Sequence, residues 1–170
     1  MMAALDSLRA EHALILEVIE SLQERAHASA DGRLPPDYVH AMLDFIRIYI
    51  DTNHHGKEER VLFSYMAADP FLAGISSILT DDHREGRILV DAIERALVEG
   101  RPVVHEVETY AAFIRVHIHR ENAMMFDVAE SELDAHTLSA MQSEFLAIES
   151  EVLGIGGAGR LLAPLQAAGV

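Results

Sequence analysis

The sequence predicts an all-α protein: an up-down-up-down antiparallel four-helix bundle with a shorter fifth helix at its C-terminus. Apolar residues recur at spacings of three and four over long stretches, and the apolar–polar alternation of strands is nearly absent. Short segments rich in small, acidic or proline residues, "SADGRLPPD", "AADP" and "EGRP", separate these stretches. Four long helices joined by short connections pack most simply as antiparallel neighbours.

The first two helices of the bundle are predicted over residues 5–27 and 36–66. Pro36 is typical of the first turn of a helix, and it marks where the second helix begins. The inward apolar residues of the first helix are Leu5, Leu8, Ile15, Leu16, Ile19 and Leu22. Those of the second helix are Leu43, Ile46, Ile50, Val61, Leu62 and Tyr65.

The third and fourth helices are predicted over residues 71–98 and 103–129, on either side of the break "EGRP". The third helix directs inward the residues Leu72, Ile75, Leu79, Val90, Ile93 and Leu97. The fourth helix directs inward Tyr110, Phe113, Ile114, Met124, Met125 and Val128.

The C-terminal part of the chain is predicted to form a fifth helix over residues 134–153, packed on the outside of the bundle. With 170 residues, the chain is most simply one domain. We therefore predict a helical bundle over residues 1–153, followed by a Gly-rich tail over residues 154–170. The composition of the tail indicates flexibility, with "LLAPL" able to dock locally.

The composition argues against several kinds of partner and site. The chain has 13 basic and 28 acidic residues, and this net charge of −15 repels both nucleic acids and anionic membranes. It has no cysteine, which excludes disulfides, thiolate metal sites and cysteine-held iron–sulfur clusters. No apolar run approaches the roughly 20 residues of a membrane span, and no secretory cleavage pattern is present. We therefore expect a soluble, cytoplasmic protein with neither nucleic acid nor membrane as a partner, and we leave its oligomeric state open.

The ten histidines fall into two groups when each is compared with the residues three, four and seven positions away, which share its helix face. One histidine of each long helix lies among apolar residues and is predicted to point into the core: His12, His54, His83 and His117. The others are predicted to lie at the surface: His27, His40, His55, His105, His119 and His136.

Two of the inward histidines have an acid four residues later on the same face, Glu58 after His54 and Glu121 after His117. An ionised carboxylate costs several kcal/mol to bury unless a cation receives it. Arg87 is the only obvious inward cation, and one arginine cannot satisfy two carboxylates and four imidazoles. Imidazoles and carboxylates suit iron, manganese or zinc, and two ions that share both glutamates would complete the set.

The segment "HHGKEERVLF" is repeated in outline by "HIHRENAMMF" in the second half of the chain. When Phe63 is matched to Phe126, His54 aligns with His117 and Glu58 aligns with Glu121, whereas His55 falls opposite Ile118. This alignment favours His54 and Glu58 as metal ligands, with His55 and Glu59 as the open alternative. It also indicates that each half of the bundle supplies half of one metal site.

Residues 5–150 resemble the hemerythrin-like, or HHE cation-binding, family in this pattern of histidines and acids. The resemblance implies that the metal ligands are His12, His54, Glu58, His83, His117 and Glu121. It implies an up-down bundle around a non-heme di-iron centre, bridged by the two carboxylates. It also implies activities of the family: binding dioxygen or nitric oxide, handling peroxide, sensing iron or oxygen, or helping to repair iron–sulfur clusters.

The sequence departs from the oxygen-carrying members of this family, which have a fifth histidine on the third helix. The corresponding positions around His83 hold Leu79 and Arg87, so the chain resembles the branch with four histidines and two glutamates unless His55 joins them. Six protein ligands leave open coordination positions, and such a position is where a small ligand binds. Gly86, on the face of His83, either leaves space beside the metal or allows tight helix packing.

We therefore expect a non-heme di-iron protein that binds or reduces dioxygen, nitric oxide or hydrogen peroxide. The expected cofactor is two iron ions, bridged by the carboxylates and by oxo or hydroxo, with manganese or zinc as alternatives. A second hypothesis is a non-catalytic iron or oxygen sensor, or a module for iron storage or donation in iron homeostasis or iron–sulfur repair. A third hypothesis is a structural bundle whose core polar residues bind nothing. No residue is assigned a catalytic role, and whether the protein is an enzyme is left open.

Overall fold

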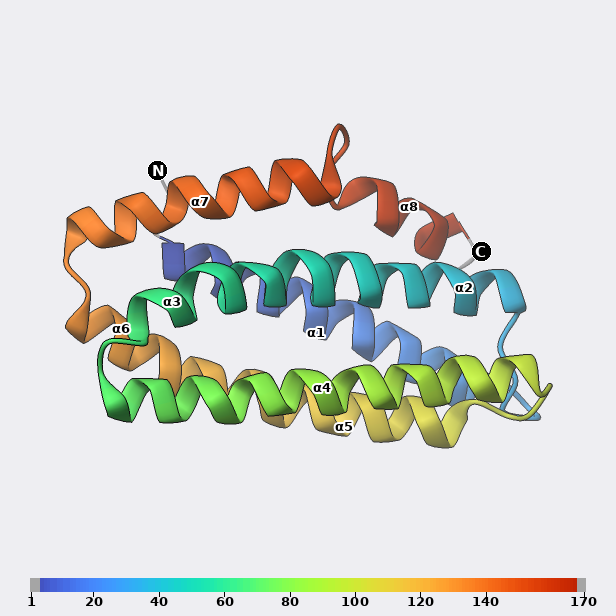
Figure 1. Cartoon of the computed structure of the whole chain (residues 1–170). Helices are drawn as coiled ribbons and strands as arrows, with labels where there is room; N and C mark the ends of the chain where they lie inside the picture. The colour runs from blue at the N-terminus through green and yellow to red at the C-terminus, as the bar shows by residue number, and fades with distance from the viewer. Residues whose placement is uncertain (1–3, 168–170) are drawn as a thin grey trace.

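Four long helical segments lie lengthwise side by side in the computed structural model, which describes residues 4–167 (Figure 1). The first is α1 (Ala4–Ala28) and the third is α4 (Pro70–Val98). The second segment is built from α2 (Pro36–Asp44), η1 (Phe45–His55), η2 (Glu58–Leu62) and α3 (Phe63–Met66). The fourth is built from α5 (Val104–Arg120), η3 (Glu121–Phe126) and α6 (Asp127–Glu132). The protein is thus an all-helical bundle, as the sequence predicts.

The starts of two helices follow directly from their capping residues. Asp69 accepts hydrogen bonds from the backbone N–H groups of Phe71 and Leu72, and Pro70 occupies the first turn of α4. Asp134 caps the N-terminus of α7 (Ala135–Leu153) in the same way, by accepting a hydrogen bond from the N–H of Thr137. The break at "AADP" and the start of the fifth helix are therefore stabilised by local hydrogen bonds.

The apolar core consists of two clusters of buried side chains. One contains Leu5 and Leu8 of α1 together with Leu79 of α4 and Phe126 of η3. The other contains residues further along α1 and α4, such as Ile15 and Ile93. In each long segment the buried histidine or glutamate lies between residues of the two clusters in the sequence. The polar side chains thus form one layer across the bundle, with apolar packing on both sides.

Two residues predicted to point inward lie at the surface instead. Tyr65 is 38% exposed and Met124 is 47% exposed. Tyr65 follows the π-helical element η2, which ends at Leu62. Met124 lies within the π-helical element η3. A π-helix turns through a smaller angle per residue than an α-helix, so an α-helical spacing rule misplaces side chains there.

The C-terminal part packs along the bundle, where α7 lies beside α1 and η1, and α8 (Gly159–Ala167) lies beside α2 (Figure 1). Met141, Phe145 and Ile148 of α7 are buried, as are Leu161 and Leu165 of α8. The local docking considered for "LLAPL" therefore occurs. The predicted division between a bundle over 1–153 and a tail over 154–170 remains a prediction. None of the helices in the described part of the chain is long and apolar enough to cross a membrane.

Candidate metal centre

All six predicted metal ligands come together in the polar layer of the bundle. His12 comes from α1, His83 from α4 and His117 from α5, and each is at most 2% exposed. Glu58 and Glu121, which begin η2 and η3, are fully buried. The sixth, His54, comes from η1 and is 1% exposed.

His55 is also buried in this layer, contrary to the prediction that it lies at the surface. It is 6% exposed, and its ring stacks on that of His83 with a centroid distance of 3.8 Å. The reason is the π-helical backbone of η1, whose hydrogen bonds reach five residues along the chain. The wider turn places His55 on the face of Ile50, five residues earlier, and lets two consecutive histidines face the core. The other five histidines predicted at the surface are exposed: His27, His40, His105, His119 and His136.

The donor atoms of these residues form two groups, each with all its atoms within 4.8 Å of one another. One group is His55, His83 and His117, and the other is His12, His54, Glu58 and Glu121. Donors at about 2.1 Å from one ion are separated by about 3 Å when adjacent and about 4 Å when opposite. The spacing within each group therefore suits one metal ion.

The two glutamates lie between the groups and direct one carboxylate oxygen to each. Glu58 has Oε1 at 3.7 Å from Nε2 of His54 and Oε2 at 3.5 Å from Nε2 of His83. Glu121 has Oε2 at 3.1 Å from Nε2 of His12 and Oε1 at 3.1 Å from Nε2 of His117. Both carboxylates are thus positioned to bridge a pair of ions.

The inward atoms of this site lack hydrogen-bond partners among the described residues. These atoms are the Nε2 atoms of all five buried histidines and both oxygens of Glu58 and Glu121. A buried polar atom without a partner costs about 1–3 kcal/mol, and more when it is charged. Divalent cations are partners that satisfy all of these lone pairs together, so the donor set fits metal ions.

The outward ring nitrogens, by contrast, all have a polar partner. Nδ1 of His54 donates to Glu11 at 2.8 Å, and Nδ1 of His83 donates to Glu59 at 2.6 Å. The remaining partners are Asn122 for His12 at 3.0 Å, Asp51 for His55 at 3.4 Å and Asp82 for His117 at 3.4 Å. A proton held on Nδ1 leaves the Nε2 lone pair free for a metal and fixes the direction of the ring.

These supporting residues were not identified from the sequence, although the doubled pattern contains them. Glu11 and Asp82 directly precede the ligands His12 and His83, and each contacts the histidine of the following segment, His54 or His117. Glu59 and Asn122 directly follow Glu58 and Glu121, and they contact His83 and His12. The repeat therefore extends to the residues that orient the ligands. Glu59 belongs to neither group of candidate ligands within the described chain.

In the absence of metal, protonated imidazole compensates the negative charge of the buried carboxylates. Burial lowers the pKa of His83, but the close approach of neighbouring carboxylates, Glu121 first among them, outweighs burial and raises the pKa to about 11. Burial raises the pKa of Glu121, but the charge of His117 and contacts with other imidazoles hold it well below its usual value. Burial, together with the charge of His83, lowers the pKa of His55 well below the usual histidine value. The carboxylate of Glu121 is therefore ionised, and a metal ion must displace a proton from His83.

The structure thus defines a helical bundle with a buried cluster of histidines and carboxylates that could bind metal. Comparison with known families agrees, because residues 3–129 match the model of the hemerythrin HHE cation binding domain. The chain belongs to this family, and membership implies a metal cofactor. The four histidines and two glutamates expected of its four-histidine, two-glutamate branch all lie in the cluster, with His55 beside them.

Similar proteins include the uncharacterized protein Mb2018 of Mycobacterium bovis and the uncharacterized protein Rv1995 of Mycobacterium tuberculosis. Each is 22% identical to this chain over 161 residues, which cover 89% of the chain and 63% of the relative. The chain therefore spans less than two thirds of the length of these relatives. No solved structure matches the chain at a significant level.

Proposed function

We propose that the protein is a non-heme di-iron protein that binds or reduces a small oxidant: dioxygen, nitric oxide or hydrogen peroxide. One iron would be held by His55, His83 and His117, and the other by His12 and His54. Glu58 and Glu121 would bridge the two ions, together with an oxo or hydroxo group. The donor set also suits manganese or zinc. We also propose that the four helical segments run antiparallel in up-down-up-down order. This order would let the two repeated segments, with His54 and Glu58 in one and His117 and Glu121 in the other, face each other across the site.

One observation carries this proposal: five imidazole Nε2 atoms and four carboxylate oxygens converge without hydrogen-bond partners among the described residues. If each carboxylate gives one oxygen to each ion, the chain offers five donors to one ion and four to the other. With the oxo or hydroxo bridge the counts would become six and five, so one position would remain for a small ligand, on the ion held by His12 and His54. Bound iron would supply this position and the electrons for reducing an oxidant.

The protein's own residues would hold and orient the pair. Glu11 and Glu59 accept hydrogen bonds from the outward nitrogens of His54 and His83, which keeps the inward nitrogens free to bind metal. The apolar clusters on both sides of the layer, for example at Leu8 and Ile15, exclude bulk water. A dry surrounding strengthens the interaction between the carboxylates and the cations.

A second candidate function is a sensor of iron or oxygen, and it is favoured by a connection between the site and α7. Lys57 donates a hydrogen bond to Glu149 of α7 at 2.8 Å and another to Glu11, which in turn binds His54. A change at His54 would therefore alter the hydrogen bonds that hold α7. Limited proteolysis of the metal-free, ferrous and ferric protein tests this function, and identical cleavage of α7 in all three forms argues against it.

The main proposal is tested by metal analysis of protein purified from iron-supplemented cells, followed by optical spectra. We expect about two irons per chain and near-ultraviolet absorption of a bridged ferric pair. Nitric oxide or peroxide should change this spectrum. The double variant Glu58→Gln/Glu121→Gln should lose the metal, whereas the exposed-site control His27→Gln should retain it. Wild-type protein that retains no stoichiometric metal would refute the proposal.

A further inference from the structure

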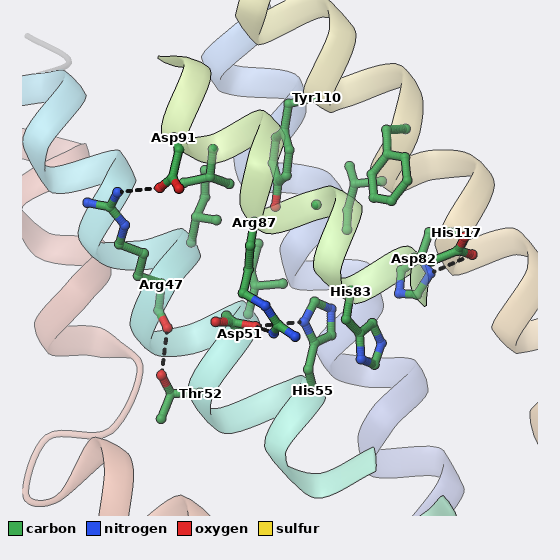
Figure 2. A pocket seen from close by; sticks show the side chains of 16 residues that line it. Arg47, Asp51, Thr52, His55, Asp82, His83, Arg87, Asp91, Tyr110 and His117 are labelled. Carbon is green, nitrogen blue, oxygen red and sulfur yellow. Dashed lines mark hydrogen bonds and ion pairs between the residues drawn. The ribbon is translucent and has the colours of Figure 1, made fainter. Parts of the chain in front are cut away.

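A cavity of about 330 Å³ lies between η1, α4 and α5, beside the three-histidine half of the site (Figure 2). Its inner end is formed by His55, His83 and His117. Its walls are mainly apolar and are made by Ile46, Ile50, Val90, Phe113 and Ile114. The cavity is far larger than a diatomic molecule or peroxide requires, since one water occupies about 30 Å³ in the liquid.

Gly86 keeps part of this cavity open. It is buried on α4 and lines the cavity, and a Cβ atom at this position would lie 3.3 Å from Cε1 of Phe113. The structure therefore supports both explanations for Gly86, which are space beside the site and close helix packing. The glycine lets Phe113 approach α4 without filling the cavity.

The charged residues at the cavity are already paired. Arg47 donates to Asp91 at 3.1 Å and to Glu94 at 2.7 Å. Arg87 donates to Asp51, and it lies 3.7 Å from Glu59. The arginines therefore leave no unbalanced charge for an anionic ligand, and the nearby carboxylates repel one. An electrically neutral ligand fits this lining best.

Tyr110 supplies the polar contact that the apolar walls lack. The residue is 2% exposed, and its hydroxyl makes no hydrogen bond with any described residue. Figure 2 shows this hydroxyl directed toward the histidine end of the cavity. A buried tyrosine hydroxyl normally finds a hydrogen-bond partner. A ligand oxygen at this end of the cavity would accept the missing hydrogen bond.

We propose that this cavity binds a neutral organic molecule with an apolar, ring-sized body and one oxygen that accepts a hydrogen bond from Tyr110. Cavities of about 150 Å³ hold benzene, so this one takes a ligand of about ten non-hydrogen atoms. The ligand lies against His55 and contacts the outward edges of the histidines. The proposal is independent of the identity of the metal, because it concerns the protein walls alone.

The test compares three probes of nearly equal size, benzyl alcohol, toluene and benzoate, by NMR titration of the metal-free full chain. Benzyl alcohol should bind and shift the side-chain signals of His55 and Tyr110 more than those of His12. Toluene should bind about fivefold more weakly, which is the value of one neutral hydrogen bond. Benzoate should not bind at the same concentrations. Benzoate that binds as tightly as benzyl alcohol, or no binding by any probe at millimolar concentration, overturns the proposal.

Two variants locate the bound molecule. Val90→Phe fills the cavity and should weaken benzyl alcohol at least tenfold, whereas Val98→Phe places the same ring on an exposed part of the same helix. Equal effects of these two variants overturn the assigned location. Tyr110→Phe removes only the hydroxyl, so it should lower the affinity for benzyl alcohol to that for toluene. An unchanged preference for the alcohol in Tyr110→Phe refutes the role of the tyrosine. These outcomes do not depend on iron binding, so they are distinct from failure of the di-iron proposal.

Discussion

Lys57 and Glu11 form an ion pair inside the bundle, between the second helical segment and α1. The side chain of Lys57 is 1% exposed and that of Glu11 is 9% exposed. Burial raises the pKa of Glu11, but His54 and Lys57 together hold it below its usual value. The ionised carboxylate of Glu11 thereby joins a buried ammonium group to a candidate metal ligand.

Removal of Lys57 should destabilise the protein strongly. In Lys57→Met the carboxylate of Glu11 stays buried without its cation, and breaking such a pair costs about 3–5 kcal/mol. Urea denaturation of the metal-free protein measures this loss. Arg60→Met is the matched control, because Arg60 pairs with Glu151 of α7 at 3.5 Å and both of these side chains are exposed. Equal decreases in the free energy of unfolding of the two variants would show that the buried ion pair stabilises the protein no more than the exposed one.

The stability of the metal-free protein should fall as the pH rises above neutrality. The pKa of His83 is raised to about 11 in the folded protein, from about 6.5 in the unfolded chain. The charge on His83 therefore contributes stability that is fully present below pH 6.5 and is lost progressively as the pH rises toward 11. The slope is at most about 1.4 kcal/mol per pH unit. Thermal unfolding between pH 6.5 and 9.5 tests this, and stability that increases over the range would contradict it.

His55 should contribute to metal binding although the sequence pattern placed it at the surface. His55→Gln removes one of the three imidazoles of its group, so we expect at least about a tenfold loss of metal affinity. His119→Gln makes the same change at an exposed position of α5 and should retain the wild-type affinity. Competition with a chelator of known affinity measures both. If His55→Gln binds metal as tightly as the wild-type protein, His55 is not a ligand and only the other four buried histidines bind metal.

The sequence was sufficient to predict the helices and the burial of six polar residues in one layer, because their apolar neighbours follow the α-helical period. The predicted third helix, residues 71–98, differs from α4 by one residue. His55 was misassigned because η1 has the wider π-helical turn, which no residue type in "YIDTNHH" signals. Glu11 and Lys57 were missed for another reason. Each lies next to a ligand in the sequence, and only the packing of α1 against the second segment shows that they face one another.

Metal loading should stabilise the protein, and the gain should depend on the bridging carboxylates. A ligand that binds only the folded state at 1,000 times its dissociation constant adds about 4 kcal/mol. Wild-type protein should therefore unfold at a clearly higher temperature with ferrous iron, and a chelator should reverse the change. Glu58→Gln/Glu121→Gln retains the size of both side chains but removes the charges that attract the ions, so its unfolding temperature should not respond to iron. An identical response in this variant would mean that iron binds elsewhere, for example at exposed acidic groups, and that the buried donors converge without holding a metal.

The metal-free double variant adds a second criterion. Without these two carboxylates only Glu59 still favours the charged form of His83, so the decline in stability above pH 6.5 should become smaller while the response to iron is lost.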